Sequence, residues 1–235
     1  MASLGPVCAS TQAGWQISWL RIKDFQHYVL LVSEESSLSL RRRPEQARSI
    51  ARVEAVLAAL KTLIGERGVD RVTMTDIAVE AGMSKAALYR YFPTKQAIVR
   101  ELMVRTWDEE NRETRELLST PTSRGLEDLS APLRALCLRL MRQPFRAQLR
   151  AAVQADEELS RLDFEDTRIN AEVFARLIVP DARPDEHRDL QRRVMLMTSL
   201  FESIVRLSTR LSPDEAERNV DDFVEIATTL LGRRS

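Results

Sequence analysis

Apolar positions recur at helical spacing along most of the chain after residue 43. From Pro44 onward, a first run places six apolar side chains three or four residues apart: Ile50, Val53, Val56, Leu57, Leu60 and Ile64. This spacing predicts an amphipathic helix over residues 46–64, closed by Gly65 and Gly68.

The helical pattern continues through the rest of the chain, and prolines with polar neighbours divide it. After Pro93 a long helix is predicted to run towards Leu118, where the stretch STPTSRG breaks it. Further helices are predicted at 126–142, 144–158, 163–179, 185–211 and 213–231. No run shows the period-two alternation of a strand, so we predict an all-α fold.

The stretch from Thr73 to Phe92 reads TMTDIAVEAGMSKAALYRYF and holds two short helical patterns. Thr73 and Asp76 form a Thr-x-x-Asp capping box for the first pattern. Gly82 suits a helix end that needs a left-handed backbone, and Ser84 can cap the second pattern. Two short helices joined by so tight a turn predict a helix-turn-helix.

The second of these helices is expected to direct Lys85, Ala86 and Tyr89 outward from its N-terminal end. In a helix-turn-helix this end reaches base edges in a DNA groove, while flanking side chains hold the phosphate backbone. Tyr91 offers a further hydroxyl, and Lys95 adds a charge at the start of the next helix. Packing of Tyr91 against its own domain is the alternative for that residue.

Charge is balanced over the whole chain, with 35 basic and 35 acidic residues, but it is unevenly distributed. Arg41 to Lys95 holds 11 basic and 6 acidic residues, whereas Gln96 to Ser235 holds 22 and 26. A basic segment favours a polyanionic partner, although a solvated helical surface has the same composition. The run Arg41 to Arg43 could enter a minor groove or form a solvated linker. Arg90 is expected to face solvent or to pair with an acidic residue.

From about Arg41 to Met103 the chain resembles a TetR-family transcriptional regulator. The resemblance rests on VTMTDIAVEAGMSKAALYRYF and PTKQAIVRELM, and above all on Tyr-x-Tyr-Phe with a lysine three positions on. It implies a three-helix DNA-binding domain, a connecting helix, and an all-helical C-terminal domain that binds an inducer and dimerises. It also implies DNA contacts by Thr73, Thr75, Ser84, Lys85, Ala86, Ala87, Tyr89, Tyr91 and Lys95.

Three regions follow from pattern and resemblance together. Residues 1–43 are expected to form a disordered N-terminal extension. Residues 44–95 are expected to form the helix-turn-helix DNA-binding domain, with its motif at about 73–92. Residues 96–235 are expected to form the helical ligand-binding and dimerisation domain.

The last two predicted helices carry apolar faces wider than a surface helix needs. Pairing them with their symmetry mates predicts a homodimer, and a two-fold dimer fits a palindromic operator on double-stranded DNA. Candidate contacts for a small-molecule inducer are the aromatic and methionine side chains Trp107, Phe145, Phe174 and Met197. Ordinary core packing is the alternative for each of them.

Other function classes find little support in the sequence. The two cysteines are far apart, and neither metal-ligand spacing nor a Gly-rich phosphate loop occurs. Neither histidine can be placed beside a nucleophile, so we expect no enzyme, no cofactor and no metal. A signal peptide and membrane-spanning runs are missing from the pattern, which predicts a cytoplasmic protein.

The sequence therefore predicts a homodimeric, ligand-responsive transcriptional regulator. We expect a repressor that a small molecule releases from its operator. The alternative is a helical dimer that acts mainly in small-molecule or protein binding and keeps a vestigial DNA-binding head.

Overall fold

The computed structural model describes residues 47–120 and 125–233, and every regular element within these ranges is helical. The all-α prediction is confirmed. The expectations for residues 1–43, including the basic run Arg41 to Arg43, lie outside the described residues.

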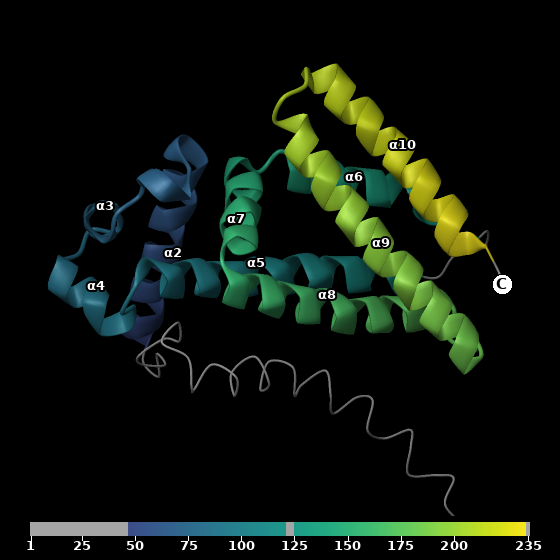
Figure 1. Cartoon of the computed structure of the whole chain (residues 1–235), viewed down its shortest axis with the longest axis horizontal. Coiled ribbons are helices and arrows are strands. Elements are labelled where there is room, and N and C mark those ends of the chain that lie inside the picture. The colour runs from purple at the N-terminus through teal and green to yellow at the C-terminus, as the bar shows by residue number, and fades with distance from the viewer. Residues whose placement is uncertain (1–46, 121–124, 234–235) are drawn as a thin grey trace, which may run out of the picture.

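The N-terminal head contains α2 (Ala47–Arg67), the 3-10 turn η1 (Val69–Arg71), α3 (Met74–Glu80) and α4 (Lys85–Tyr91). It lies at one end of the molecule in Figure 1. The predicted apolar stripe of α2 is buried, with exposed fractions of 0–4% from Val53 to Ile64 at the stripe positions. Ile50 is the exception, since it is 47% exposed and its placement in the stripe was wrong.

The end of α2 corrects a second expectation. Gly65 does not close the helix, which continues to Arg67 and ends at Gly68 with φ +76°. A Cβ added at Gly65 would lie 3.5 Å from the backbone nitrogen of Phe145 and from Cβ of Pro144. A later helix therefore begins beside α2 at this position, at a distance that still admits a methyl group.

The remaining helices form the C-terminal part of the fold. Their bounds are α5 (Lys95–Leu118), the 3-10 segment η2 (Gly125–Leu129), α6 (Ser130–Met141), α7 (Pro144–Ala155), α8 (Glu157–Ile178), α9 (Pro184–Ser208) and α10 (Pro213–Gly232). Helix α8 begins at Glu157 and not at residue 163. The reason is an N-cap, because the Asp156 side chain accepts a hydrogen bond from the Leu159 amide at 3.0 Å.

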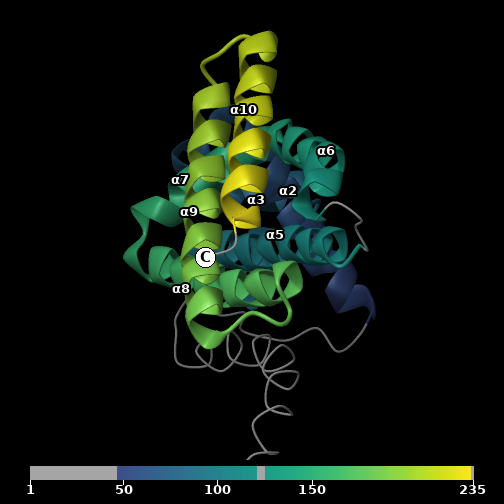
Figure 2. The ribbon, with the colours of Figure 1, turned by 90° about the vertical axis from the view of Figure 1, so that its right-hand side faces the viewer.

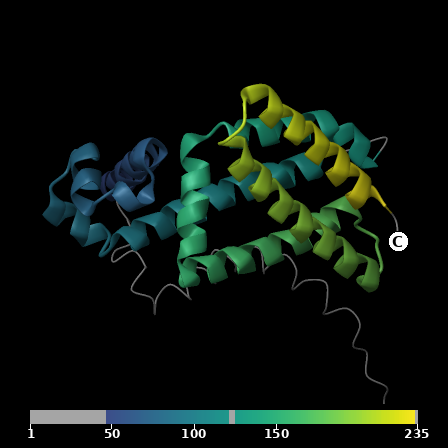
Figure 3. The same cartoon turned by 45° about the horizontal axis from the view of Figure 1, so that its top comes forward.

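Helix α5 runs from the head across the molecule beside α8, and α9 crosses over both (Figures 1 and 3). Helices α9 and α10 lie side by side on the face turned away from the head, as Figure 2 shows. Their contact includes the rings of Phe201 and Phe223, whose centroids are 5.4 Å apart.

Helix α7 stands between the head and helices α6, α9 and α10 in Figure 3. Its apolar residues Leu149 and Val153 are fully buried in the same cluster as Leu60 of α2 and Leu102 of α5. The head therefore shares a continuous core with α5 and α7. Among the described residues, no helix is long and apolar enough to cross a membrane.

Candidate nucleic-acid interface

The helix-turn-helix is built by the local signals in its sequence. Thr73 and Asp76 form the complete capping box of α3, with the Thr73 amide donating to the Asp76 carboxylate at 2.8 Å. These hydrogen bonds from Thr73, together with the nearby Arg67, hold the pKa of Asp76 below its usual value. Gly82 makes the turn at φ +64°, and Ser84 caps α4 by accepting from the Ala87 amide at 3.1 Å.

One face of α4 is buried and the opposite face is open. Leu88 is fully buried and anchors α4 against the head, whereas Lys85 and Ala86 are exposed and Tyr89 is 37% exposed. The Lys85 ammonium lies 6.0 Å from the centre of the Tyr89 ring. The structure thus brings three of the predicted DNA contacts together on one outward face.

The predicted contacts around this face differ in exposure. Thr75 is exposed on the first turn of α3, and Ser84 is exposed at the cap of α4. Ala87 is half-buried beside the turn. Thr73 is exposed, but its hydroxyl already bonds to Asp76 at 2.7 Å.

Tyr91 packs against its own domain, as the alternative for this residue expected. Its side chain is 8% exposed and packs in the core of the head. Its phenolic oxygen reaches the first turns of α2. Hydrogen bonds from Ser49, which has the larger effect, and from Arg52 lower the pKa of Tyr91. Sequence reasoning missed Arg52, because this contact joins side chains that lie far apart in the chain.

Lys95 has a structural engagement that the sequence did not reveal. Its ammonium donates to the carbonyl of Val69 at 2.9 Å and to that of Val72 at 3.0 Å. It therefore ties the start of α5 to η1. An ammonium has three N–H donors, so one remains for a phosphate.

The four candidate ligand contacts do not come together in one place. Trp107 lies in the apolar cluster shared with the head, and Phe145 packs against it. Met197 lies in a second cluster between α6, α9 and α10. Phe174 lies in a third cluster between α8 and α9. Trp107, Phe174 and Met197 are each at most 7% exposed.

A cleft of about 1000 Å³ lies elsewhere, between the C-terminal ends of α5, α8 and α10 and the first turns of α9. Leu118, Leu190 and Leu231 contribute to its apolar wall, while Glu186 and Arg193 are among its charged residues. None of the four candidate ligand contacts lines it.

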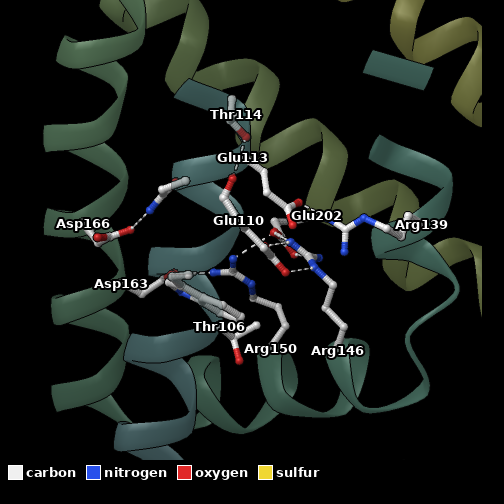
Figure 4. A network of polar contacts seen from close by, with 12 residues as sticks. Thr106, Glu110, Glu113, Thr114, Arg139, Arg146, Arg150, Asp163, Asp166 and Glu202 are labelled. Atoms are coloured by element: carbon white, nitrogen blue, oxygen red, sulfur yellow. Dashed lines mark hydrogen bonds and ion pairs between the residues drawn. The ribbon is translucent and has the colours of Figure 1, made fainter. Parts of the chain in front are cut away.

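A buried ionic network fixes α7 to its neighbours (Figure 4). Arg146 of α7 is 2% exposed and donates to Glu110 of α5 and to Glu202 of α9, with 2.8 Å contacts to each. Arg150, one turn further on, donates to Glu202 at 2.8 Å and to Asp163 of α8 at 2.6 Å. Burial alone would raise the pKa of Glu202, but the two arginines hold it below its usual value.

Asp166 lies beside this network on α8. Asn111 and Asn170 donate to its carboxylate at 2.9 and 3.1 Å. Burial, with a further contribution from the neighbouring charges of Asp163 and Asp108, raises the pKa of Asp166 to about 6.

In the ranges that the structure describes, no group of His, Cys, Asp and Glu side chains is arranged to hold a metal ion. Cys137 is buried, and burial raises the pKa of its thiol to about 12, so this thiol is not an activated nucleophile.

Comparisons with known proteins match both parts of the chain. Residues 56–102 match the family model "Bacterial regulatory proteins, tetR family", and residues 137–234 match "Tetracyclin repressor-like, C-terminal domain". Together these two matches cover more than half of the chain. The HTH-type transcriptional regulator EthR of Mycobacterium tuberculosis is 27% identical over 97 residues, which are 41% of this chain and 45% of that protein. The chain thus matches less than half of the length of this curated relative.

Solved structures match over a larger share. A TetR-family transcriptional regulator from Streptomyces coelicolor has a TM-score of 0.59 and 22% identity, covering 79% of this chain and 98% of that one. SmeT, the repressor of the Stenotrophomonas maltophilia multidrug efflux pump SmeDEF, has a TM-score of 0.58 and 17% identity, covering 76% and 89%. At these identities the likeness is one of fold.

Proposed function

Because this chain belongs to the TetR family of bacterial regulatory proteins, it is a DNA-binding transcriptional regulator, and we propose that it acts as a homodimeric repressor that a small molecule releases from a palindromic operator. The repressor assignment is supported by the similar fold of SmeT, which is itself a repressor. Family and fold are those of regulators, which are not enzymes.

The observation that carries the proposal is the outward face of α4. Lys85, Ala86 and Tyr89 are exposed there, while caps at both short helices and the buried Leu88 hold the helix rigidly. Such a face can enter a major groove, where Lys85 meets base edges or phosphate and Tyr89 donates its hydroxyl. The remaining candidate contacts would then face the DNA phosphate backbone on either side of the major groove. They are Thr73, Thr75, Ser84, Ala87, Tyr91 and the third N–H donor of Lys95.

Dimerisation through α9 and α10 is supported by apolar side chains that these helices expose. Leu196 is 51% exposed and Leu207 is 48% exposed on α9, and Ile226 is 47% exposed on α10. Large apolar residues exposed along two adjacent helices fit a two-fold helical interface. Two heads related by that axis would read the two halves of a palindrome.

Release by a small molecule is supported by the apolar core that the head shares with α5 and α7. A ligand shifts the equilibrium only by binding one arrangement of the heads better than another. Trp107, Phe145, Phe174 and Met197 stay candidate contacts, and the cleft at the far end of α5 is a second place for such a ligand.

Selection from a random pool of duplexes, followed by a salt titration of the enriched sequence, tests the proposal. We expect a palindrome whose affinity falls steeply as salt rises. Lys85→Ala should weaken binding and change the preferred sequence, whereas Tyr89→Phe should weaken binding to all sequences equally. Absence of enrichment, even after refolding free of small molecules, would favour the alternative of a helical binding protein with a vestigial head.

A further inference from the structure

A groove of about 400 Å³ separates the first half of α2 from the turn and second helix of the helix-turn-helix. Small residues make most of its walls, among them Ala51 and Ala55 of α2, Gly82 of the turn and Ala87 of α4. Because these residues have little or no side chain, the two helices leave open space beside the outward face of α4.

Two arginines line this groove, Arg52 from α2 and Arg90 from α4. Both side chains are exposed, and in the part of the chain that the structure describes neither has a carboxylate partner. Several other exposed arginines are paired, such as Arg112 with Glu116 at 2.9 Å and Arg176 with Glu172 at 2.9 Å. Of the two alternatives for Arg90, the structure therefore shows exposure to solvent. Among the described residues it shows no acidic partner.

One arginine of the groove, Arg52, is also held in place from below. Arg52 donates to the oxygen of Tyr91, whose ring is fixed in the core, and the charges of Arg52 and Arg90 both act on that oxygen. Ser84, the cap of α4, is exposed at the same groove. Two positive charges and the hydroxyl of Ser84 thus border a pocket whose lining, among the described residues, includes no acidic side chain.

We propose that this groove receives a phosphate of the DNA backbone, held by Arg52 and Arg90, outside the base edges that α4 reads. A guanidinium matches the geometry of a phosphodiester by donating two parallel N–H groups to it. Arg90 follows Tyr89 and lies about 100° further round α4, so the groove adjoins the reading face without being part of it. The sugar-phosphate backbone of DNA likewise runs along the edge of the major groove, beside the base edges. Contacts to that backbone set the register of the protein on its site.

This inference rests on the DNA-binding part of the proposed function and adds two contacts that the recognition helix pattern did not contain. Removing one phosphate contact from each head of the dimer lowers the slope of log affinity against log salt by about 1.8, which is about 0.9 for each contact. We expect Arg52→Gln and Arg90→Gln each to produce that loss, with roughly tenfold weaker binding at moderate salt, equally on operator and random duplex.

Arg112→Gln is the matched charge control, because it removes one exposed arginine of α5 far along the chain from the groove. Its slope should equal that of wild type. If all three variants change the slope equally, the effect is one of net charge and the proposal is wrong. Should Arg52→Gln fail to fold, as judged by its thermal transition, Arg90→Gln carries the test, since no described hydrogen bond depends on Arg90.

A neutral change separates the groove from a diffuse positive field. Ala51→Leu fills the groove without changing charge, and Ala58→Leu places the same side chain at an exposed position of α2 that does not line it. We expect Ala51→Leu to weaken DNA binding several-fold and Ala58→Leu to leave it unchanged. Equal affinities of these two variants would overturn the groove as the seat of the phosphate.

Single methylphosphonate substitutions in the operator locate the phosphate. At one symmetry-related position in each half-site, the neutral linkage should weaken wild type but have no further effect on Arg90→Gln. Independent, additive losses at every position would contradict the proposal. If Lys85→Ala weakens binding while the arginine variants do not, the regulator stands and the groove assignment fails; if wild type binds no duplex, both fail.

Discussion

Asp166 has a carboxyl whose pKa, about 6, lies above the usual value of 3.8. The folded protein therefore holds this proton more tightly than the unfolded chain does. The resulting stabilisation is fully present below pH 4 and is lost as the pH rises through 6. At neutral pH the ionised Asp166 therefore lowers the free energy of unfolding, which means that it destabilises the folded protein.

Asp166→Asn should remove that cost, because the amide is neutral and similar in shape. We expect the variant to be about 1–2 kcal/mol more stable than wild type at pH 7.5, and the difference to vanish near pH 4. Urea unfolding at both pH values measures it. A variant less stable than wild type at pH 7.5 would show that the hydrogen bonds from Asn111 and Asn170 outweigh desolvation.

Lys95 provides a second prediction for a single residue. Lys95→Met keeps the aliphatic stem but removes the hydrogen bonds to the carbonyls of Val69 and Val72. We expect the free energy of unfolding to fall by about 1–3 kcal/mol, because hydrogen bonds from a charged donor are lost. Weaker DNA binding with unchanged stability would instead mark Lys95 as a simple phosphate contact.

At the scale of elements, two glycines have opposite roles. Gly82 has φ +64° and no atom within 4 Å of an added Cβ. Alanine there would therefore meet no steric clash with neighbouring residues, but it would have to adopt an unfavourable left-handed backbone conformation. Gly65 lies inside α2, and its added Cβ would make ordinary contacts at 3.5 Å. The first position requires glycine for the turn, whereas the second tolerates a side chain.

Gly82→Ala should therefore destabilise the head by about 1 kcal/mol, with Gly82→Asn affected less. Gly65→Ala should be neutral or stabilise by up to about 1 kcal/mol, because alanine favours a helix interior. Chemical denaturation of Gly82→Ala and Gly65→Ala shows whether each substitution lowers or raises the free energy of unfolding. Destabilisation by Gly65→Ala would mean that α7 cannot yield to the added methyl group.

Helix α7 is joined to the three helices around it by charge as well as by apolar packing. Arg146 is nearly inaccessible, and its removal would leave Glu110 and Glu202 buried without their partner. We expect Arg146→Met to cost about 3–5 kcal/mol. Arg112→Gln breaks an exposed pair and should cost no more than about 1 kcal/mol, so thermal unfolding of both variants separates a buried network from a surface one.

At the scale of the whole molecule, the proposed dimer depends on the outer face of α9 and α10. Leu196→Arg introduces a charge on a side chain that is 51% exposed in the single chain. We expect a folded monomer in light scattering and loss of operator binding, because two heads are needed for a palindrome. A dimer that persists in this variant would place the interface elsewhere.

The sequence determined the local structure of this protein. Capping at Thr73 and Ser84, the turn at Gly82 and the apolar spacing of α2 each act between residues a few positions apart, so they could be interpreted without coordinates. The same local pattern also identified the outward face of α4. Helix starts depended on caps, and the missed cap at Asp156 is the reason that α8 began earlier than predicted.

Only the tertiary structure decided which distant side chains meet. Tyr91 reaches Arg52, Lys95 reaches the carbonyls of η1, and the arginines of α7 reach Glu110, Asp163 and Glu202. The aromatic ligand candidates separated into different clusters for the same reason. Helical periodicity states that a residue faces inward, but the packing of whole helices against one another decides what it faces.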